Sequence, residues 1–229
     1  MIRLKRAHPT SARGPCTWLL GLILLVVACT AAAGPRILVF GDSLSAAHGI
    51  PQQAGWVALL RQSLVTDYPD ALIVNASVSG ETTAGGLSCL PATLKRETPD
   101  IVILELGGND GLQALPPARM QDNLAAMIKA SQAAGARVLL LGIRIPPNYG
   151  PAYTQRFEAV FATLATQYKL AFDPFFLAPI AGDRTQFQAD GIHPITTAEP
   201  ALRKRVMKTL QPMLAKPAAD ASKRPSAGG

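Results

Sequence analysis

Short apolar segments alternate with helical patterns along this chain, and the alternation limits the fold to a small set of α/β architectures. The apolar segments are nearly continuous runs at 36–40, 71–75, 101–106, 138–143 and 170–172. Runs of this kind are typical of parallel strands that are covered on both faces. We therefore predict a three-layer α/β/α sandwich around a parallel, doubly wound sheet, with ligands bound at the carboxyl ends of the strands.

Apolar side chains recur at helical spacing between and after these runs. The repeats fall within 56–64, 120–131, 157–168 and 202–214. In the last repeat, Arg203 to Arg205 and Lys208 lie opposite the apolar stripe, which is the pattern of an amphipathic helix. We interpret the aromatic and Met side chains of the repeats as core residues and not as parts of a cofactor site.

The charge of the chain is unevenly distributed. The 229 residues include 22 Lys and Arg against 15 Asp and Glu, a formal charge of +7. Residues 1–33 hold four cations and no acids, and residues 203–229 hold seven cations and one acid, which leaves 11 basic and 14 acidic residues, a net −3, in 34–202. A mildly acidic body does not attract a polyanion, so we expect no nucleic-acid partner. The Pro-, Ala- and Ser-rich end, 216–229, is interpreted as a disordered tail.

The first 33 residues have the pattern of a cleaved export signal. A basic stretch precedes an eleven-residue apolar run, 18–28, which is shorter than the about 20 residues that a membrane-spanning helix needs. The small residues Ala31 to Ala33 then predict cleavage before Gly34 and a periplasmic or secreted bacterial protein. Val26 to Cys29 also resembles a lipobox, so a lipid anchor on Cys29 is the alternative. An uncleaved membrane anchor is the third interpretation.

Cysteine and histidine usage argues against a disulfide, a metal site or a cofactor. Removal of Cys16 and Cys29 with the signal leaves Cys89, which we interpret as a small buried apolar residue. The mature chain has only two histidines, and they are too far apart in sequence to indicate a metal-ligand set. There is no G-x-G-x-x-G fingerprint or Walker A motif, so we expect no nucleotide cofactor.

Candidate catalytic residues follow the first apolar run and precede the last helical pattern. Ser43 lies in Gly-Asp-Ser-Leu-Ser, directly after the first run. A nucleophilic serine needs a base, and His193 stands three residues after Asp190, a spacing that lets the carboxylate orient the imidazole. His48 has no neighbour that would orient its ring, so we interpret it as a surface or structural residue.

Two polar clusters follow the second and third runs. One is Asn-Ala-Ser-Val-Ser-Gly, which ends at Gly80, and the other is Gly-Gly-Asn-Asp-Gly, which contains Asn109. The Gly80 N–H and the Asn109 amide are candidate donors to an oxyanion. The neighbouring Asp42 and Asp110 are interpreted as loop-bonding residues and not as the acid of a triad.

Four of these blocks together resemble the SGNH (GDSL) hydrolase superfamily. Ser43, Gly80, Asn109 and His193 match its four blocks in order, and the resemblance extends over most of 36–214. Within the superfamily the chain is most similar to the thioesterase I/protease I/lysophospholipase branch of exported arylesterases, through 104–111, 144–150 and 174–177. The resemblance implies a flavodoxin-like fold and a hydrolase domain over 34–215.

The resemblance also implies a mechanism and a substrate class. Ser43, His193 and Asp190 would form a catalytic triad, and the N–H groups of Ser43 and Gly80 with the Asn109 amide would form the oxyanion hole. The expected protein is an exported monomeric serine esterase, free of cofactor and metal, that acts on small-molecule esters and thioesters, lysophospholipids included, with transient membrane-surface contact.

Two other functions remain open from the sequence. One is a carbohydrate O-acetylesterase of the same superfamily, and the other is a non-catalytic envelope binding protein. The position of 112–117 after Asn109 suggests, as a hypothesis, a mobile lip of an acyl groove.

Overall fold

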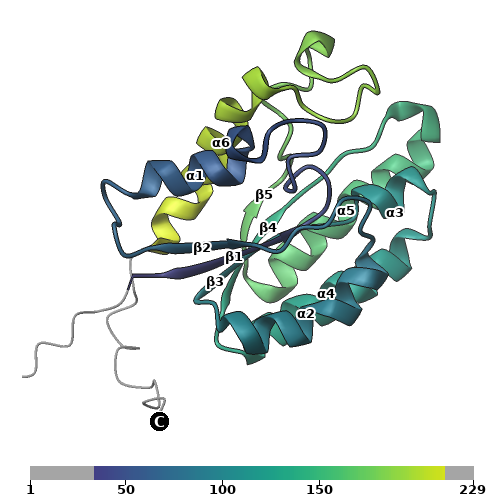
Figure 1. The fold of residues 1–229 in the computed structure, drawn as a ribbon. Coiled ribbons are helices and arrows are strands. Elements are labelled where there is room, and N and C mark those ends of the chain that lie inside the picture. Colours follow the sequence, from purple (N-terminus) through teal and green to yellow (C-terminus); the bar gives the residue numbers. More distant parts are fainter. Residues whose placement is uncertain (1–33, 215–229) are drawn as a thin grey trace, which may run out of the picture. The chain divides into compact units, whose positions relative to one another are not determined.

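The five apolar runs form one parallel sheet (Figure 1). The computed structural model describes residues 34–214, so the predicted export signal, Cys29 and the predicted tail lie outside the described residues. The sheet order is β2-β1-β3-β4-β5, the flavodoxin-like order that was predicted. The strands are β1 (Arg36–Gly41), β2 (Leu72–Asn75), β3 (Ile101–Glu105), β4 (Arg137–Leu141) and β5 (Ala171–Asp173).

Helices cover both faces of the sheet and complete the predicted three layers (Figure 1). One face packs against α1 (Trp56–Leu64) and α6 (Glu199–Leu214). The other packs against α2 (Thr83–Glu97), α4 (Pro117–Ala133) and α5 (Pro151–Tyr168). None of the helices within 34–214 has the length and hydropathy that a membrane span requires. The connections contain α3 (Gly108–Leu112) and the 3₁₀ turns η1 (Gln52–Ala54), η2 (Pro147–Tyr149), η3 (Arg184–Gln186) and η4 (Thr196–Ala198).

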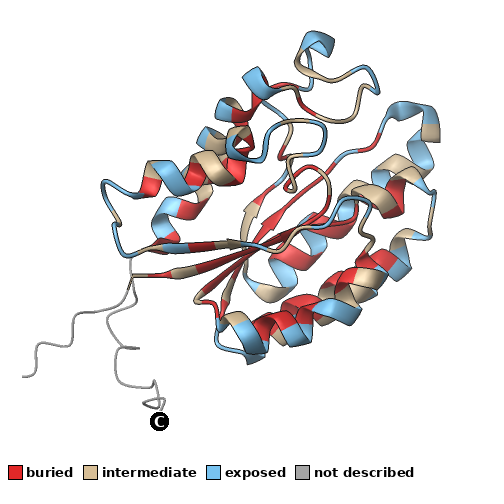
Figure 2. Cartoon of the chain, viewed as in Figure 1, coloured by how far each residue is buried: buried red, intermediate tan, exposed pale blue. Residues whose placement is uncertain are grey.

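The core lies on both sides of the sheet because successive strand residues point to opposite faces. In β1, Ile37 and Val39 pack toward α1 and α6, whereas Leu38 and Phe40 pack toward the other three long helices. Buried residues accordingly run along β1, β3 and β4 and along the inner sides of the helices (Figure 2). Full burial of one such aliphatic side chain contributes about 1.5–3 kcal/mol, so the sheet is a rigid support for the loops at its ends.

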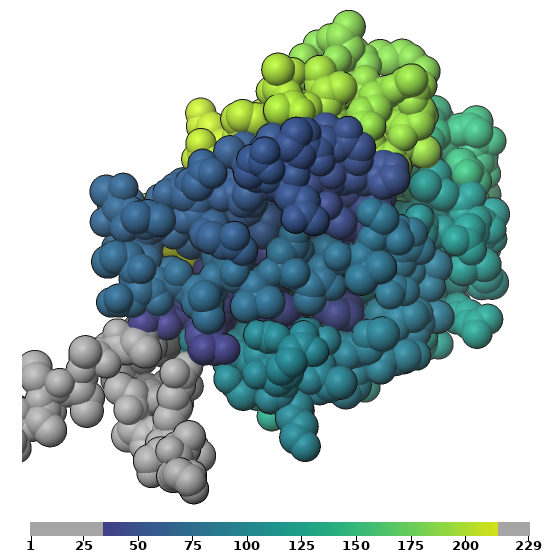
Figure 3. All heavy atoms as spheres, viewed as in Figure 1, coloured from purple at the N-terminus to yellow at the C-terminus, as the bar shows by residue number. Residues whose placement is uncertain are grey.

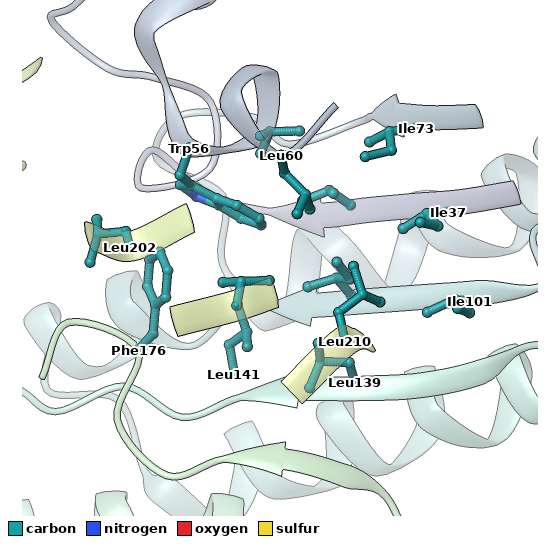
Figure 4. Packing of buried hydrophobic residues seen from close by; sticks show 14 of the residues in the cluster. Ile37, Trp56, Leu60, Ile73, Ile101, Leu139, Leu141, Phe176, Leu202 and Leu210 are labelled. Atoms are coloured by element: carbon teal, nitrogen blue, oxygen red, sulfur yellow. The ribbon is translucent and has the colours of Figure 1, made fainter. Parts of the chain in front are cut away.

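Trp56 joins α1 to α6 and to the loop after β1. Its indole packs beside Phe176 and near Leu202 (Figure 4), and its Nε1 donates to the Leu44 carbonyl at 3.2 Å. Trp56 is the first residue of α1, and its backbone N–H donates at 2.7 Å to Oε2 of Glu199, the first residue of α6. Burial raises the pKa of the Glu199 carboxyl to about 7, and the hydrogen bond from Trp56 opposes that rise. The two helices and the loop are therefore fixed to one another.

Helices α2 and α3 were not predicted from the sequence. Two adjacent glycines and Pro91 weaken the helical signal of α2, yet Gly86 allows a close approach to the sheet, since a Cβ there would lie 2.6 Å from Leu106 Cδ1. The interpretation of Cys89 as buried was wrong. Cys89 is exposed, because the buried stripe of α2 passes through Gly86, Leu90 and Thr93 and leaves position 89 facing outward.

Candidate active site

The turn after β1 holds Ser43 at the carboxyl end of the sheet. The Asp42 carbonyl accepts the N–H groups of Ser45 and Ala46 at 3.2 and 3.0 Å, and Asp42 Oδ1 accepts the Leu44 N–H at 3.0 Å. This confirms the interpretation of Asp42 as a loop-bonding residue. Ser43 is half-buried at the point where the sheet changes its winding direction, between β1 and β3.

Ser43, His193 and Asp190 form a continuous hydrogen-bonded chain. His193 Nε2 lies 2.8 Å from Ser43 Oγ, although the two residues are 150 positions apart in sequence. His193 Nδ1 lies 2.6 Å from Asp190 Oδ2. The other carboxylate oxygen, Oδ1, accepts the backbone N–H groups of Ile192 and His193 at 2.9 and 3.0 Å. The structure thus brings together the three residues that the sequence singled out as nucleophile, base and acid.

Asp190 is held as a carboxylate. Partial desolvation raises the pKa of this carboxyl, but the hydrogen bonds from the His193 ring and from two backbone N–H groups outweigh it and lower the pKa to about 2. The backbone reaches this geometry through Gly191, whose φ of +70° lies in the left-handed region that favours glycine. An ionised Asp190 can therefore fix the imidazole tautomer that accepts a proton at Nε2.

Backbone N–H groups at two positions are free to bind an anion. Within residues 34–214, the N–H groups of Ser43 and Gly80 donate no hydrogen bond. Gly80 has φ +82°, and a Cβ on it would meet no atom within 4 Å, so backbone conformation and not space requires glycine there. Both residues line the same cavity as His193.

Asn109 also lines that cavity, from the first turn of α3. Its Nδ2 donates to the Glu81 carbonyl at 2.9 Å and to Asp42 Oδ2 at 3.2 Å. The side-chain amide is therefore oriented by two fixed acceptors, and both of its hydrogens are engaged in this structure. Asp110 points away, accepting the Thr83 N–H at 2.8 Å and the Thr83 hydroxyl, as expected for a loop-bonding residue.

The cavity at Ser43 has a volume of about 650 Å³, within the range of small-molecule sites. Its wall is largely aliphatic and aromatic, which suits a hydrocarbon acyl group. The apolar lining residues include Leu44, Leu112, Ile143, Ile145, Phe175 and Leu177. Of the hypothesised lip 112–117, Leu112 lines the cavity, and the Tyr149 and Tyr153 hydroxyls donate to the Leu112 and Leu115 carbonyls, each at 2.7 Å.

Two buried carboxyls lie directly behind the nucleophile turn. Glu105 ends β3 beside Gly41, and its Oε2 accepts the Ser45 hydroxyl at 2.6 Å and the Asp42 N–H at 3.4 Å. Its other oxygen, Oε1, is buried without a partner among the described residues. Burial, and then the negative charge of Asp42, raise the pKa of Glu105 well above its usual value. Burial likewise raises the pKa of Asp42 to about 6, against the hydrogen bond from Leu44.

The sequence prediction missed several supporting residues of this site. Glu105 was included in an apolar run, and a lone acid inside such a run is the signal that could have singled it out. Glu81, Gln188 and Glu199 carried no signal, because their contacts cross between distant segments. No group of three or more His, Cys, Asp or Glu side chains in residues 34–214 is arranged to hold a metal ion.

Comparison with protein-family models identifies the chain. Residues 39–197 match the model of the GDSL-like lipase/acylhydrolase family. The chain belongs to this family. Membership makes it an ester-hydrolysing enzyme, and the GDSL name describes the Gly-Asp-Ser-Leu block that contains Ser43.

Individual GDSL-family proteins are similar over most of the chain. Esterase TesA of Pseudomonas aeruginosa is 50% identical over 194 residues, which cover 85% of this chain and 96% of that protein. Thioesterase 1/protease 1/lysophospholipase L1 of Escherichia coli is 38% identical over 193 residues, 84% of this chain and 91% of that protein. The crystal structure of esterase EstA from Pseudoalteromonas, inhibited by monoethylphosphonate, superposes with a TM-score of 0.75 at 41% identity, covering 79% of this chain and 98% of that one.

Proposed function

We propose that this enzyme is an exported serine esterase that hydrolyses carboxylic esters and acyl thioesters through an acyl-enzyme on Ser43. The observation that carries the proposal is the hydrogen-bonded chain from Ser43 Oγ to His193 Nε2, at 2.8 Å, and from His193 Nδ1 to Asp190 Oδ2, at 2.6 Å. An isolated serine hydroxyl is a weak nucleophile, and an oriented neutral imidazole within hydrogen-bond distance is what activates it.

Acylation begins when Ser43 Oγ attacks the acyl carbonyl carbon and gives its proton to His193 Nε2. The ionised Asp190 stabilises the imidazolium that forms. His193 then protonates the leaving alcohol or thiol as the bond to the carbonyl carbon breaks. Water repeats the attack with His193 again as base, and the carboxylic acid is released from Ser43.

The tetrahedral oxyanion of each step binds to three donors. The Ser43 and Gly80 N–H groups are unengaged in this structure and line the cavity. The Asn109 amide is the third donor, and it binds the oxyanion by giving up the longer of its two hydrogen bonds, the one to Asp42 Oδ2. Donors that are already oriented need little rearrangement when charge develops on the substrate oxygen.

The apolar cavity wall and the relatives support the proposed substrate class. The names of the relatives reported above describe an esterase and a thioesterase/lysophospholipase. Aryl esters, fatty acyl thioesters and lysophospholipids each place a hydrocarbon acyl or aryl group beside the scissile carbonyl, and an aliphatic wall favours such groups.

A chain-length series tests the reaction and the substrate class together. The substrates are p-nitrophenyl acetate, butyrate and octanoate, a lysophosphatidylcholine, an acyl-CoA and an acetylated sugar. We expect turnover of the acyl esters and thioester, and a loss of roughly 10⁴-fold or more in Ser43→Ala, with the exposed-site variant Ser88→Ala at wild-type rate. Undiminished turnover in Ser43→Ala would refute the mechanism. Activity confined to the acetylated sugar would indicate a carbohydrate O-acetylesterase. Absence of turnover with every substrate would indicate a binding protein.

Export rests on residues 1–33, and its test is independent of activity. We expect expression of the full chain in a Gram-negative bacterium to give a periplasmic or secreted enzyme that starts at Gly34. Recovery in the membrane fraction with a lipid on Cys29 would instead support the lipobox, and this outcome would be lost in Cys29→Ser. An intact amino terminus in the cytoplasm would contradict export.

A further inference from the structure

The proposed mechanism does not use His48, yet this residue lies against the base. The centroids of the His48 and His193 rings are 4.3 Å apart, with 38° between their planes. Both ring nitrogens of His193 already bond to Asp190 and Ser43. The contact with His48 is therefore a packing contact between the two rings. His48 is itself exposed and lines the cavity at Ser43.

The backbone that carries His48 is held in place from two directions. The His48 N–H donates to the Ser43 carbonyl at 3.2 Å, which closes the turn after β1. Its carbonyl accepts Gln188 Nε2 at 2.8 Å. The flanking residues Ala47 and Gly49 have φ of +58° and +72°, so His48 stands at a sharply bent point of the chain.

Gln188 joins this turn to the loop of the catalytic imidazole. Besides the bond to His48, its Nε2 donates to the Pro194 carbonyl at 2.9 Å. Its backbone N–H donates to the His193 carbonyl at 2.7 Å, and its own carbonyl accepts the Gly191 N–H at 2.9 Å. One residue thus bonds both to the backbone of the turn after β1 and to the backbone of the His193 loop. In Figure 3 the blue segment after β1 and the yellow-green segment before α6 lie against each other.

We propose that His48, held by Gln188, is a positioning residue that keeps the His193 ring in the orientation that reaches Ser43. The inference rests on the proposed function, because it assigns His48 a role through the base. His193 must accept a proton from Ser43 and deliver it to the leaving group, and both transfers need the same ring orientation. A ring packed against His193 limits its rotation, which lowers the fraction of molecules in which Nε2 points away from Ser43.

Aromatic replacement separates packing from other roles of His48. Because packing needs a ring and not an ionisable group, we expect His48→Ala to lower kcat by roughly tenfold with KM nearly unchanged, and His48→Phe to restore kcat to within about twofold of wild type. The matched control is Gln53→Ala, at an exposed position on η1 that does not line the cavity. Wild-type kcat in His48→Ala, or an equal loss in the Ala and Phe variants, would overturn the proposal.

A double-mutant cycle tests the link to Gln188. Gln188→Met keeps the length of the side chain and removes its donors, so we expect it to lower kcat as His48→Ala does. If both substitutions act through His193, the fold-decrease in kcat of the double variant is much smaller than the product of the two single fold-decreases. Multiplicative losses would overturn the link. Should the wild-type enzyme hydrolyse no ester, the proposed function fails; if it is active and His48→Ala is equally active, only the present inference fails.

Discussion

Glu105 is a carboxylic acid at the end of an otherwise apolar strand. Within residues 34–214 it forms no ion pair, its Oε2 accepts hydrogen bonds from the Ser45 hydroxyl and the Asp42 N–H, and its Oε1 has no hydrogen-bond partner. In such surroundings the charged form is disfavoured, so the folded protein binds this proton more tightly than the unfolded chain does.

Glu105→Gln tests this protonation through stability. The pKa of Glu105 is raised in the folded state. Its protonation therefore stabilises the folded protein fully below pH 4.5, the pKa in the unfolded chain, and this stabilisation is lost as the pH rises toward the folded pKa. Wild type loses this stabilisation as the pH rises, and the variant, which has no carboxyl at this position, does not. We therefore expect the stability of Glu105→Gln relative to wild type to increase as the pH rises above 4.5 in urea unfolding. A difference that is independent of pH would contradict a raised pKa of Glu105.

Asn109 is the side-chain donor of the proposed oxyanion hole. Removal of one such donor typically costs about 3 kcal/mol of transition-state stabilisation, so Asn109→Ala should lower kcat roughly a hundredfold or more with little change in KM. Steady-state kinetics with p-nitrophenyl butyrate measures this. Asn123→Ala is the control, since its amide bonds to Thr83 Oγ1 instead of lining the cavity. Equal effects of the two variants would remove Asn109 from the chemistry.

Helix α3 links the proposed oxyanion donor to the apolar wall of the cavity. It contains Asn109 and ends at Leu112, which lines the cavity and whose carbonyl accepts the Tyr149 hydroxyl. We expect Leu112→Trp to fill part of the acyl pocket and to lower kcat/KM for p-nitrophenyl octanoate roughly tenfold more than for the acetate. An unchanged ratio of the two specificity constants would place the acyl chain elsewhere in the cavity.

The strands could be predicted from the sequence, whereas helix α2 could not. Parallel strands buried on both faces are apolar at nearly every position, and Ile101 to Leu104 of β3 shows this clearly. Helix α2 contains Gly85, Gly86 and Pro91, which oppose helix formation locally. Its stability comes from packing, since Gly86 lets the helix approach Phe40 and Leu106. That compensation exists only in the folded protein.

The proposed catalytic residues could be predicted because each lies in a short sequence motif, whereas the residues that support them could not. Asp190 and His193 are three residues apart, so the spacing alone indicates the pair. Gln188 bonds to His48 across 140 positions, and Glu105 to Ser45 across 60. Such contacts depend on how the sheet brings distant loops together, and no short pattern reports them.

The molecule as a whole combines a mildly acidic enzyme body with basic ends. The net −3 of residues 34–202 belongs to the part that holds the site, and the excess of cations lies in 1–33 and 203–229. The site is assembled from segments that span Ser43 to His193, so it depends on the complete sheet. We therefore expect the reaction to be a property of the entire folded domain and not of an isolated segment.

The proposed mechanism makes Ser43 the nucleophile, activated by His193 and Asp190. Intact-mass and peptide mass spectrometry after reaction with a p-nitrophenyl alkylphosphonate measures it directly, because the reagent traps the attacking oxygen. We expect a single adduct on the peptide that contains Ser43, much slower formation of this adduct in His193→Ala, and none in Ser43→Ala. An adduct on another serine, such as Ser79, or undiminished labelling of Ser43→Ala would contradict it.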